Sequence, residues 1–177
     1  MSTNYLALPL GSAAPEVVNA VIEIPMGSSN KYEYDKRLHV FRLDRKLYSP
    51  VHYPGDYGFI PSTLAEDGDP LDVLVLVEGG TFSGCLVEVR PIGQLDMRDQ
   101  GKPDEKILAV ATQNPRFADV RGYDDMYPHQ LLEIRHFFSI YKDLEGKRVE
   151  IVDWQDAEQA RQNILACHRR YAASNRT

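Results

Sequence analysis

The sequence has very few cysteines, no long apolar run and no tract rich in lysine and arginine. Its two cysteines, Cys85 and Cys167, lack metal-type spacing, so we expect free thiols in a reducing cytoplasm. Apolar runs such as VLVLV (73–77) and ILAVA (107–111) are far shorter than the roughly 20 residues that span a bilayer. The N-terminus lacks a basic segment followed by an apolar one, so a secretory signal is not expected. These absences predict a cytoplasmic protein that makes no membrane contact.

The charge balance is acidic, with a formal net charge of −6 at pH 7. A nucleic-acid-binding protein needs a basic surface, so the sequence argues against that class. A small anionic substrate stays compatible with it, because a metal ion can bridge carboxylates to phosphate oxygens. The length of 177 residues, 43% of them hydrophobic, predicts one globular domain over 1–177, in which 1–16 is an extended N-terminal segment.

The segment EDGDPLD places four carboxylates within seven positions: Glu66, Asp67, Asp69 and Asp72. Neither a regular strand nor a helix would put the last three on one face. Gly68 and Pro70 sit where the chain would have to bend for them to converge. Converging carboxylates repel one another unless a cation offsets their charge. The segment therefore predicts either a solvated turn or a cation site.

Common metal and nucleotide motifs do not explain this segment. An EF-hand loop starting at Asp67 would need an oxygen ligand at Leu71 and glycine at Asp72. A phosphatase that uses the first aspartate of DxD as nucleophile carries it after a buried strand, whereas these carboxylates precede one. The sequence contains neither GxxxxGK[ST] nor HExxH, and its five histidines are dispersed. Oxygen ligands then favour a hard cation such as magnesium or manganese.

Short β-type segments separated by Gly, Pro and Asp clusters recur along the chain, at 17–25, 38–44, 72–77, 85–97, 106–112 and 148–154. Two helices are expected at 128–146 and about 156–173, each with apolar residues at helical spacing. The pattern predicts a small, largely antiparallel sheet or closed barrel with two flanking helices. The fold class is α+β, mainly β.

Other charged and aromatic positions are weak signals when taken singly. Asp99, Asp104 and Lys106 fit an exposed hairpin turn as well as a site, and the segment 51–61 fits a loop that caps the core. Charge alternation along an exposed strand would explain Lys31, Glu33 and Arg45 equally well. Tyr141 and Lys142 close the first expected helix, where core packing and a favourable terminal cation would account for them.

The order of these motifs along one chain is far more specific. The segments IEIP, KYE, LDR, YPGDYGFIP, DGDPLDVLV, D-x4-D-x-K and HFFxxYKDLE resemble the soluble, magnesium-dependent inorganic pyrophosphatases of family I, bacterial type. The resemblance runs from about Val18 to Ala173. It implies hydrolysis of pyrophosphate to two orthophosphates on an OB-like β-barrel with flanking helices. It also implies a homo-oligomer, expected to be a hexamer.

The resemblance further assigns roles to individual residues. It implies several magnesium ions per site, with manganese as an alternative, on Asp67, Asp72, Asp99, Asp104 and Glu33. Asp69 would be the general base for the attacking water. The implied phosphate contacts are Lys31, Arg45, Tyr57, Lys106, Tyr141 and Lys142. Glu23 matches a peripheral acidic position, Glu66 has no implied role, and His136 would be either an interface or a core residue.

Two other functions stay open at this stage. A metal-dependent hydrolase of nucleotide diphosphates would need a pocket for the base, for which no distinct segment stands out. A non-catalytic OB-type module could bind single-stranded nucleic acid through its aromatic residues, but the net charge and the clustered aspartates argue against it.

Overall fold

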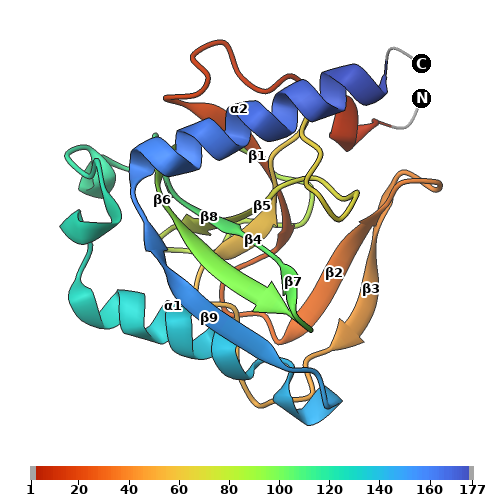
Figure 1. The fold of residues 1–177 in the computed structure, drawn as a ribbon, viewed down its shortest axis with the longest axis vertical. Coiled ribbons are helices and arrows are strands. Elements are labelled where there is room, and N and C mark those ends of the chain that lie inside the picture. Colours follow the sequence, from red (N-terminus) through yellow and green to blue (C-terminus); the bar gives the residue numbers. More distant parts are fainter. Residues whose placement is uncertain (1–2, 176–177) are drawn as a thin grey trace.

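The computed structural model describes residues 3–175, which form a β-barrel with helices packed on its outside (Figure 1). Helix α1 spans Pro128–Ile140 and helix α2 spans Ala157–Ser174. The strands are β1 (Val18–Ile24), β2 (Asn30–Asp35), β3 (Val40–Lys46), β4 (Asp56–Phe59), β5 (Asp72–Leu76), β6 (Leu86–Asp99), β7 (Lys102–Pro103), β8 (Lys106–Ala111) and β9 (Val149–Gln155). Short 3-10 turns are η1 (Tyr5–Ala7), η2 (Pro115–Phe117), η3 (Tyr123–Asp125) and η4 (Asp143–Glu145).

The barrel closes through five strands that are hydrogen-bonded in the cyclic order β1, β4, β5, β8, β6 and back to β1. Four of these pairings are antiparallel, and the β5–β8 pairing is parallel, with Asp72 opposite Lys106. Strands β7 and β9 extend from β6, whereas β2 and β3 form a separate hairpin beside the barrel. The predicted closed barrel with two flanking helices is confirmed, and the parallel pair is the exception to its antiparallel pattern.

Close strand contacts let this small barrel close. A Cβ atom on Gly58 would lie 1.9 Å from the Val21 carbonyl oxygen, so only glycine allows β4 to approach β1 this closely. Register shifts between Pro91 and Gly93 and between Asp96 and Met97 bend the long strand β6, which pairs with β1, β8 and β9. Strand β6 thus belongs to the closed five-strand barrel and also pairs with the outer strands β7 and β9.

Strand β5 is buried on both faces, and its two faces belong to different apolar clusters, each of which includes residues of one helix. Val73 and Val75 of β5 belong to the apolar cluster that includes Ile164 of α2. The alternating residues Leu74 and Leu76 belong to the cluster that includes helix α1. Burial of both faces explains why β5 is a continuous apolar run rather than an alternating one.

Several element boundaries differ from the sequence-based expectation. The first helix ends at Ile140 rather than at 146, and η4 then leads to Gly146, whose positive φ of 70° ends the turn. Strand β4 was not expected because it is only four residues long, and β2 was considered only as an exposed strand with alternating charges. Residues 1–16 were expected to be extended, but η1 is a capped 3-10 turn, and residues 1–2 lie outside the described part.

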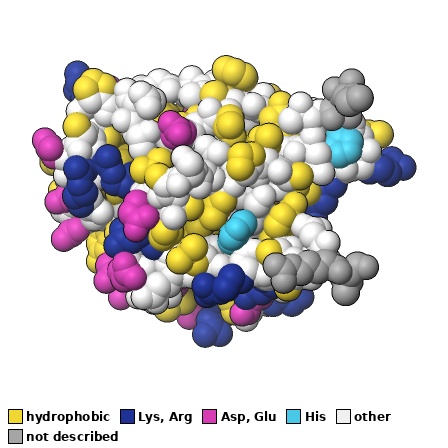
Figure 2. Space-filling model, turned by 90° about the horizontal axis from the view of Figure 1, so that it is seen from above, with side chains coloured by type: hydrophobic (Ala, Val, Ile, Leu, Met, Phe, Trp, Pro, Cys, Tyr) yellow, Lys and Arg dark blue, Asp and Glu magenta, His cyan; other side chains and the backbone are white. Residues whose placement is uncertain are grey.

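The surface above α2 carries basic and acidic side chains intermixed near its edges, with apolar side chains scattered between them (Figure 2). This mixture does not have the form of a basic footprint for nucleic acid. No helix within residues 3–175 is long and apolar enough to cross a membrane.

Candidate active site

A cavity of about 660 Å³ lies between the barrel and the β2–β3 hairpin. All the residues that the sequence predicted for the site line this cavity, with the exception of Arg45. They come from separate parts of the chain. Lys31 and Glu33 lie on β2, Tyr57 on β4, Asp72 on β5, Asp99 on β6, Asp104 and Lys106 at β8, and Tyr141 and Lys142 after α1. Asp67 and Asp69 lie in the loop 65–71, which we call the acidic loop. The fold therefore brings together, in one cavity, residues whose motifs are weak signals of a site when each is taken singly.

The acidic loop bends where the sequence placed its flexible residues. Gly68 has a positive φ of 90°, which favours glycine, and the amide of Asp69 donates to the Asp67 carboxylate over 3.0 Å. The amide of Ala65 donates to the Asp69 carbonyl over 2.7 Å and closes the turn. Asp72 then starts β5, so the loop delivers three aspartates to the cavity.

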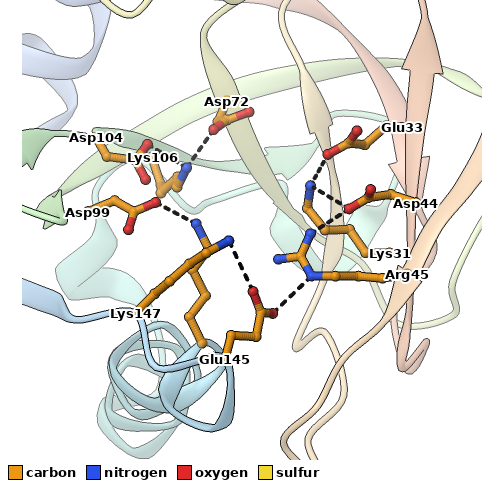
Figure 3. Close-up of polar contacts among 11 residues, drawn as sticks. Lys31, Glu33, Asp44, Arg45, Asp72, Asp99, Asp104, Lys106, Glu145 and Lys147 are labelled. Atoms are coloured by element: carbon orange, nitrogen blue, oxygen red, sulfur yellow. Dashed lines mark hydrogen bonds and ion pairs between the residues drawn. The ribbon is translucent and has the colours of Figure 1, made fainter.

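The barrel side of the cavity carries alternating charges, which we call the wall cluster. It comprises Asp72, Asp99, Asp104 and Lys106 (Figure 3), together with Lys142, which pairs with Asp99. The Lys106 ammonium lies 2.5 Å from Asp72 and 2.6 Å from Asp104, and its side chain is only 5% exposed. Burial acts to lower the pKa of Lys106, but its acidic neighbours, Asp72 foremost, outweigh this and hold the pKa well above its usual value. Lys106 is therefore a permanent buried cation.

The second ion pair of the wall cluster joins Lys142 to Asp99 over 2.5 Å. Because α1 ends at Ile140, the chain turns and Lys142 lies in the cavity instead of continuing a helix. The other carboxylate oxygen of Asp99, Oδ1, is buried and has no hydrogen-bond partner among residues 3–175. A buried oxygen without a donor is a position that a cation or a water would satisfy.

Lys31 and Glu33 line the cavity from the hairpin side and belong to the hairpin cluster, which comprises Lys31, Glu33, Asp44, Arg45, Glu145 and Lys147 (Figure 3). Lys31 pairs with Glu33 on the same strand, and Arg45 pairs with Asp44. Arg45 Nε also donates to the Glu145 carboxylate over 2.9 Å, which ties the hairpin to η4. Burial acts to raise the pKa of Glu145, but Arg45 and Lys147 outweigh it and lower the pKa. Glu145 therefore stays ionised and holds Arg45 in place.

Two tyrosines add neutral donors to the cavity. Burial raises the pKa of Tyr57 well above its usual value and also raises the pKa of Tyr141. Both phenols therefore stay protonated near neutral pH and can donate hydrogen bonds without adding charge. Their rings pack in the core beside Phe138, so the positions of the hydroxyl groups are fixed by the fold.

The carboxylates suit a hard divalent cation in their chemistry, since they offer only oxygen ligands and include the partnerless oxygen of Asp99. Within residues 3–175, however, no three His, Cys, Asp or Glu side chains are grouped so that they could hold a metal ion. The reason is that lysines pair with the carboxylates: Lys106 with Asp72 and Asp104, Lys142 with Asp99, and Lys36 with Asp69. Ammonium groups thus supply compensating positive charge beside these carboxylates.

Three residues at or beside the site received no firm role from the sequence. Lys36, at the β2–β3 turn, lies 2.7 Å from Asp69 across the cavity mouth. Glu145 orients Arg45. It is the last residue of the motif HFFxxYKDLE, so the sequence did contain a signal that could have pointed to it. Glu23 lines the cavity and accepts from the Tyr34 amide, and burial raises its pKa to about 8. No local pattern in the sequence marks Lys36, because its partner is distant along the chain.

A closed OB-like barrel whose cavity combines carboxylates, lysines and protonated phenols defines a class of protein that can bind a small polyanion. Comparison with known proteins specifies the family. A model of the inorganic pyrophosphatase family matches residues 20–172. The chain belongs to the inorganic pyrophosphatase family.

Individual relatives agree with this assignment over nearly the whole chain. The inorganic pyrophosphatase of Halalkalibacterium halodurans is 54% identical over 157 residues, covering 89% of this chain and 96% of the relative. The crystal structure of the Thermus thermophilus inorganic pyrophosphatase matches with a TM-score of 0.94 at 47% identity, covering 96% of this chain and 99% of that one. The Helicobacter pylori inorganic pyrophosphatase matches with a TM-score of 0.89 at 38% identity, covering 93% and 98%. The family predicted from the sequence is confirmed.

Proposed function

We propose that this protein hydrolyses inorganic pyrophosphate to two orthophosphates in the cavity between the wall cluster and the hairpin cluster. Membership of the inorganic pyrophosphatase family supports the reaction. The single observation that carries the site is that all the predicted residues except Arg45 line one cavity. The alternatives, a nucleotide diphosphate hydrolase and a nucleic-acid-binding module, are not favoured, since the relatives described above are named inorganic pyrophosphatases.

The proposed cofactor is magnesium, several ions per site, with manganese as an alternative. Asp67, Asp72, Asp99, Asp104 and Glu33 would hold the ions through carboxylate oxygens, the ligands that these cations prefer. When bound, the ions supply charge neutralisation for the phosphate oxygens and activation of the attacking water. The lysines that pair with Asp72, Asp99 and Asp104 would then be free to turn toward phosphate oxygens.

Asp69 is the proposed general base. Its side chain is 66% exposed and lines the cavity, so water can reach it. A general base must lie within hydrogen-bond reach of the water whose proton it accepts. Lys36 Nζ lies 2.7 Å from the Asp69 carboxylate and so helps to hold it in place.

Cations and phenols from both sides would bind the substrate. Lys106 and Lys142 reach the cavity from the wall cluster, and Lys31 and Arg45 lie in the hairpin cluster. Their positive charges stabilise phosphate oxygens as negative charge shifts toward the leaving group. Tyr57 and Tyr141 add hydrogen bonds that carry no charge.

A homo-oligomer, expected to be a hexamer, and a cytoplasmic location complete the proposal. Leu132 of α1 and the preceding Tyr127 are largely exposed apolar residues, which supports burial against another subunit. His136 is exposed on α1, so the core role considered for it is wrong, and an interface role is proposed. Sedimentation velocity would measure the subunit number.

A phosphate-release assay tests the proposal most directly. We expect rapid release of phosphate from pyrophosphate with magnesium, slow release from nucleoside triphosphates, and a loss of at least about 100-fold in Asp69→Asn. The variant should keep its fold by circular dichroism. Unimpaired turnover in Asp69→Asn would overturn the assignment of the base. A preference for nucleoside triphosphates over pyrophosphate would overturn the substrate.

A further inference from the structure

The chain that leads into the acidic loop is bound to helix α2 by backbone and side-chain hydrogen bonds. The Leu64 amide donates to the Cys167 carbonyl over 3.0 Å, and Arg170 Nη1 donates to the Leu64 carbonyl over 2.6 Å. His168 Nδ1 lies 2.7 Å from the Ser62 carbonyl, and since a carbonyl only accepts, this nitrogen carries the proton. Both polar backbone groups of Leu64 are thus fixed by α2. We call these contacts the α2 anchor.

The anchored segment is coupled directly to the metal-binding aspartates. The buried hydroxyl of Thr63 donates to the Ile60 carbonyl over 2.5 Å and accepts from the Leu71 amide over 2.9 Å. This residue therefore joins the start of the acidic loop to its end, one position before Asp72. A displacement at Leu64 would move both ends of the loop.

Arg170 also approaches the acidic loop with its charge. Its Nη2 lies 3.8 Å from the carboxylate of Glu66, the residue to which the sequence assigned no role. Its Nη1 lies 3.6 Å from the Cys167 sulfur. Arg170 itself lies outside the cavity lining, so it can act on the site only through the loop.

Helix α2 is in turn fixed to the barrel, which makes it a rigid support. Asn163 Nδ2 donates to the side-chain oxygen of Gln94 over 2.8 Å, and Gln94 donates to Asp96 over 2.6 Å. Gln94 is buried in β6, and Ile164 is buried against the barrel beside Asn163. The polar contacts thus run from β6 through α2 to the acidic loop.

We propose that Arg170 and His168 are positioning residues, which hold the acidic loop in the conformation that binds divalent metal ions. The inference rests on the proposed function, in which Asp67 and Asp72 are metal ligands. Without Arg170 the Leu64 carbonyl would lose this donor, and the segment that leads into the loop would lose one of its three hydrogen bonds to α2 described above. Groups that orient metal ligands typically affect metal affinity by about 10- to 100-fold.

The test is binding of Mn²⁺ alone to the full-length protein, measured by electron paramagnetic resonance of the free ion. For Arg170→Met we expect affinity to fall about tenfold, and for Arg170→Lys, which keeps one donor, by less. The magnesium concentration that gives half-maximal turnover should rise in parallel, while kcat at saturating magnesium and the KM for pyrophosphate stay unchanged. The neighbouring and exposed Arg169→Met is the matched control and should behave as the wild type.

His168→Phe keeps a ring but loses the bond to Ser62, and it provides a second variant should Arg170→Met fail to fold. We expect a fall in Mn²⁺ affinity of about threefold, since one hydrogen bond is lost. Asp67→Asn separates the inference from the proposed function. Wild-type Mn²⁺ binding in both anchor variants, alongside weakened binding in Asp67→Asn, would overturn the positioning role alone. Wild-type binding in Asp67→Asn would overturn the proposed ligand set.

Discussion

The wall cluster and the hairpin cluster both contribute residues to the cavity, Lys31 and Glu33 in the case of the hairpin, but the two clusters are held in different ways (Figure 3). In the wall cluster, Lys106 is almost fully buried between two carboxylates that begin or precede barrel strands. In the hairpin cluster, Glu33 is 48% exposed and Asp44 is 34% exposed, and the supporting sheet has only two strands. Charges in water are screened, whereas buried charges depend on their partners. Substitutions in the wall cluster should therefore lower both activity and the free energy of unfolding. Substitutions in the hairpin cluster should lower activity with little effect on the free energy of unfolding.

The largest expected effect is that of Lys106→Met. The change leaves Asp72 and Asp104 facing each other without their shared cation. We expect the free energy of unfolding, measured in urea without metal, to fall by about 3 kcal/mol, the usual result of removing one member of a buried ion pair. Pyrophosphate turnover should fall at least about 100-fold, as for the loss of one transition-state donor.

Arg45→Met is the matched change in the hairpin cluster. It should also impair turnover but should lower the free energy of unfolding by less than about 1 kcal/mol, because each partner keeps a second cation, Lys31 for Asp44 and Lys147 for Glu145. Equal losses of stability in the two variants would break the distinction between the clusters.

Glu23 connects the two clusters, and Glu23→Gln tests that connection through pH. Glu23 lies on β1, accepts from Tyr34 on β2, and has Asp72, Lys31 and Glu33 as charged neighbours. Burial raises its pKa from 4.5 to about 8, so the folded state binds a proton that the unfolded state releases. Its contribution is fully favourable below pH 4.5 and is lost as the pH rises through 8.

Glu23→Gln keeps the acceptor but removes this titration. The variant should be about as stable as the wild type near pH 4.5 and more stable than it by roughly 2 kcal/mol at pH 6, with the difference still growing toward pH 8. Thermal unfolding between pH 5 and 8, without metal, measures the difference. Parallel curves for the two proteins would show that Glu23 does not titrate in this range.

The wall cluster was also the more predictable part from sequence. VLVLV marks a buried strand, and the carboxylates of DGDPLD directly precede it, so their place at the mouth of the barrel follows from local pattern. The acidic loop bends at Gly68 as predicted. The closed barrel was predictable from strand spacing, but the parallel β5–β8 pairing was not, because strand order depends on contacts distant in sequence.

The hairpin cluster could be predicted less well for a physical reason. Strand β2 has one fully buried residue, Tyr34, so its sequence lacks the alternation that identifies a strand. The pairing of Arg45 with Glu145 joins positions 100 residues apart, and nothing local specifies it. The early end of α1 at Ile140 was missed because Tyr141 is buried at helical spacing although it lies beyond the last helical residue.

A smaller effect is expected when the support of Arg45 is changed by Glu145→Gln. Glutamine keeps an acceptor for Arg45 Nε but loses the charge that holds the guanidinium. The KM for pyrophosphate should rise about fivefold, within the range for one charged hydrogen bond, with kcat nearly unchanged. Glu150→Gln, an exposed change on β9, is the control. A loss in kcat with KM unchanged would contradict a role limited to placing Arg45.

The smallest expected effect is that of Lys36→Met, which removes the single ion pair between the hairpin turn and Asp69. Both side chains are more than half exposed, at 54% and 66%, so solvent screens the pair. The melting temperature should change by no more than about 2 °C, and turnover at saturating substrate by about twofold. Because Lys36 also lines the cavity, the KM for pyrophosphate should rise by about twofold, as steady-state kinetics would measure. A fall in kcat of tenfold or more would contradict this minor role, because it would show that Asp69 depends on Lys36 to function.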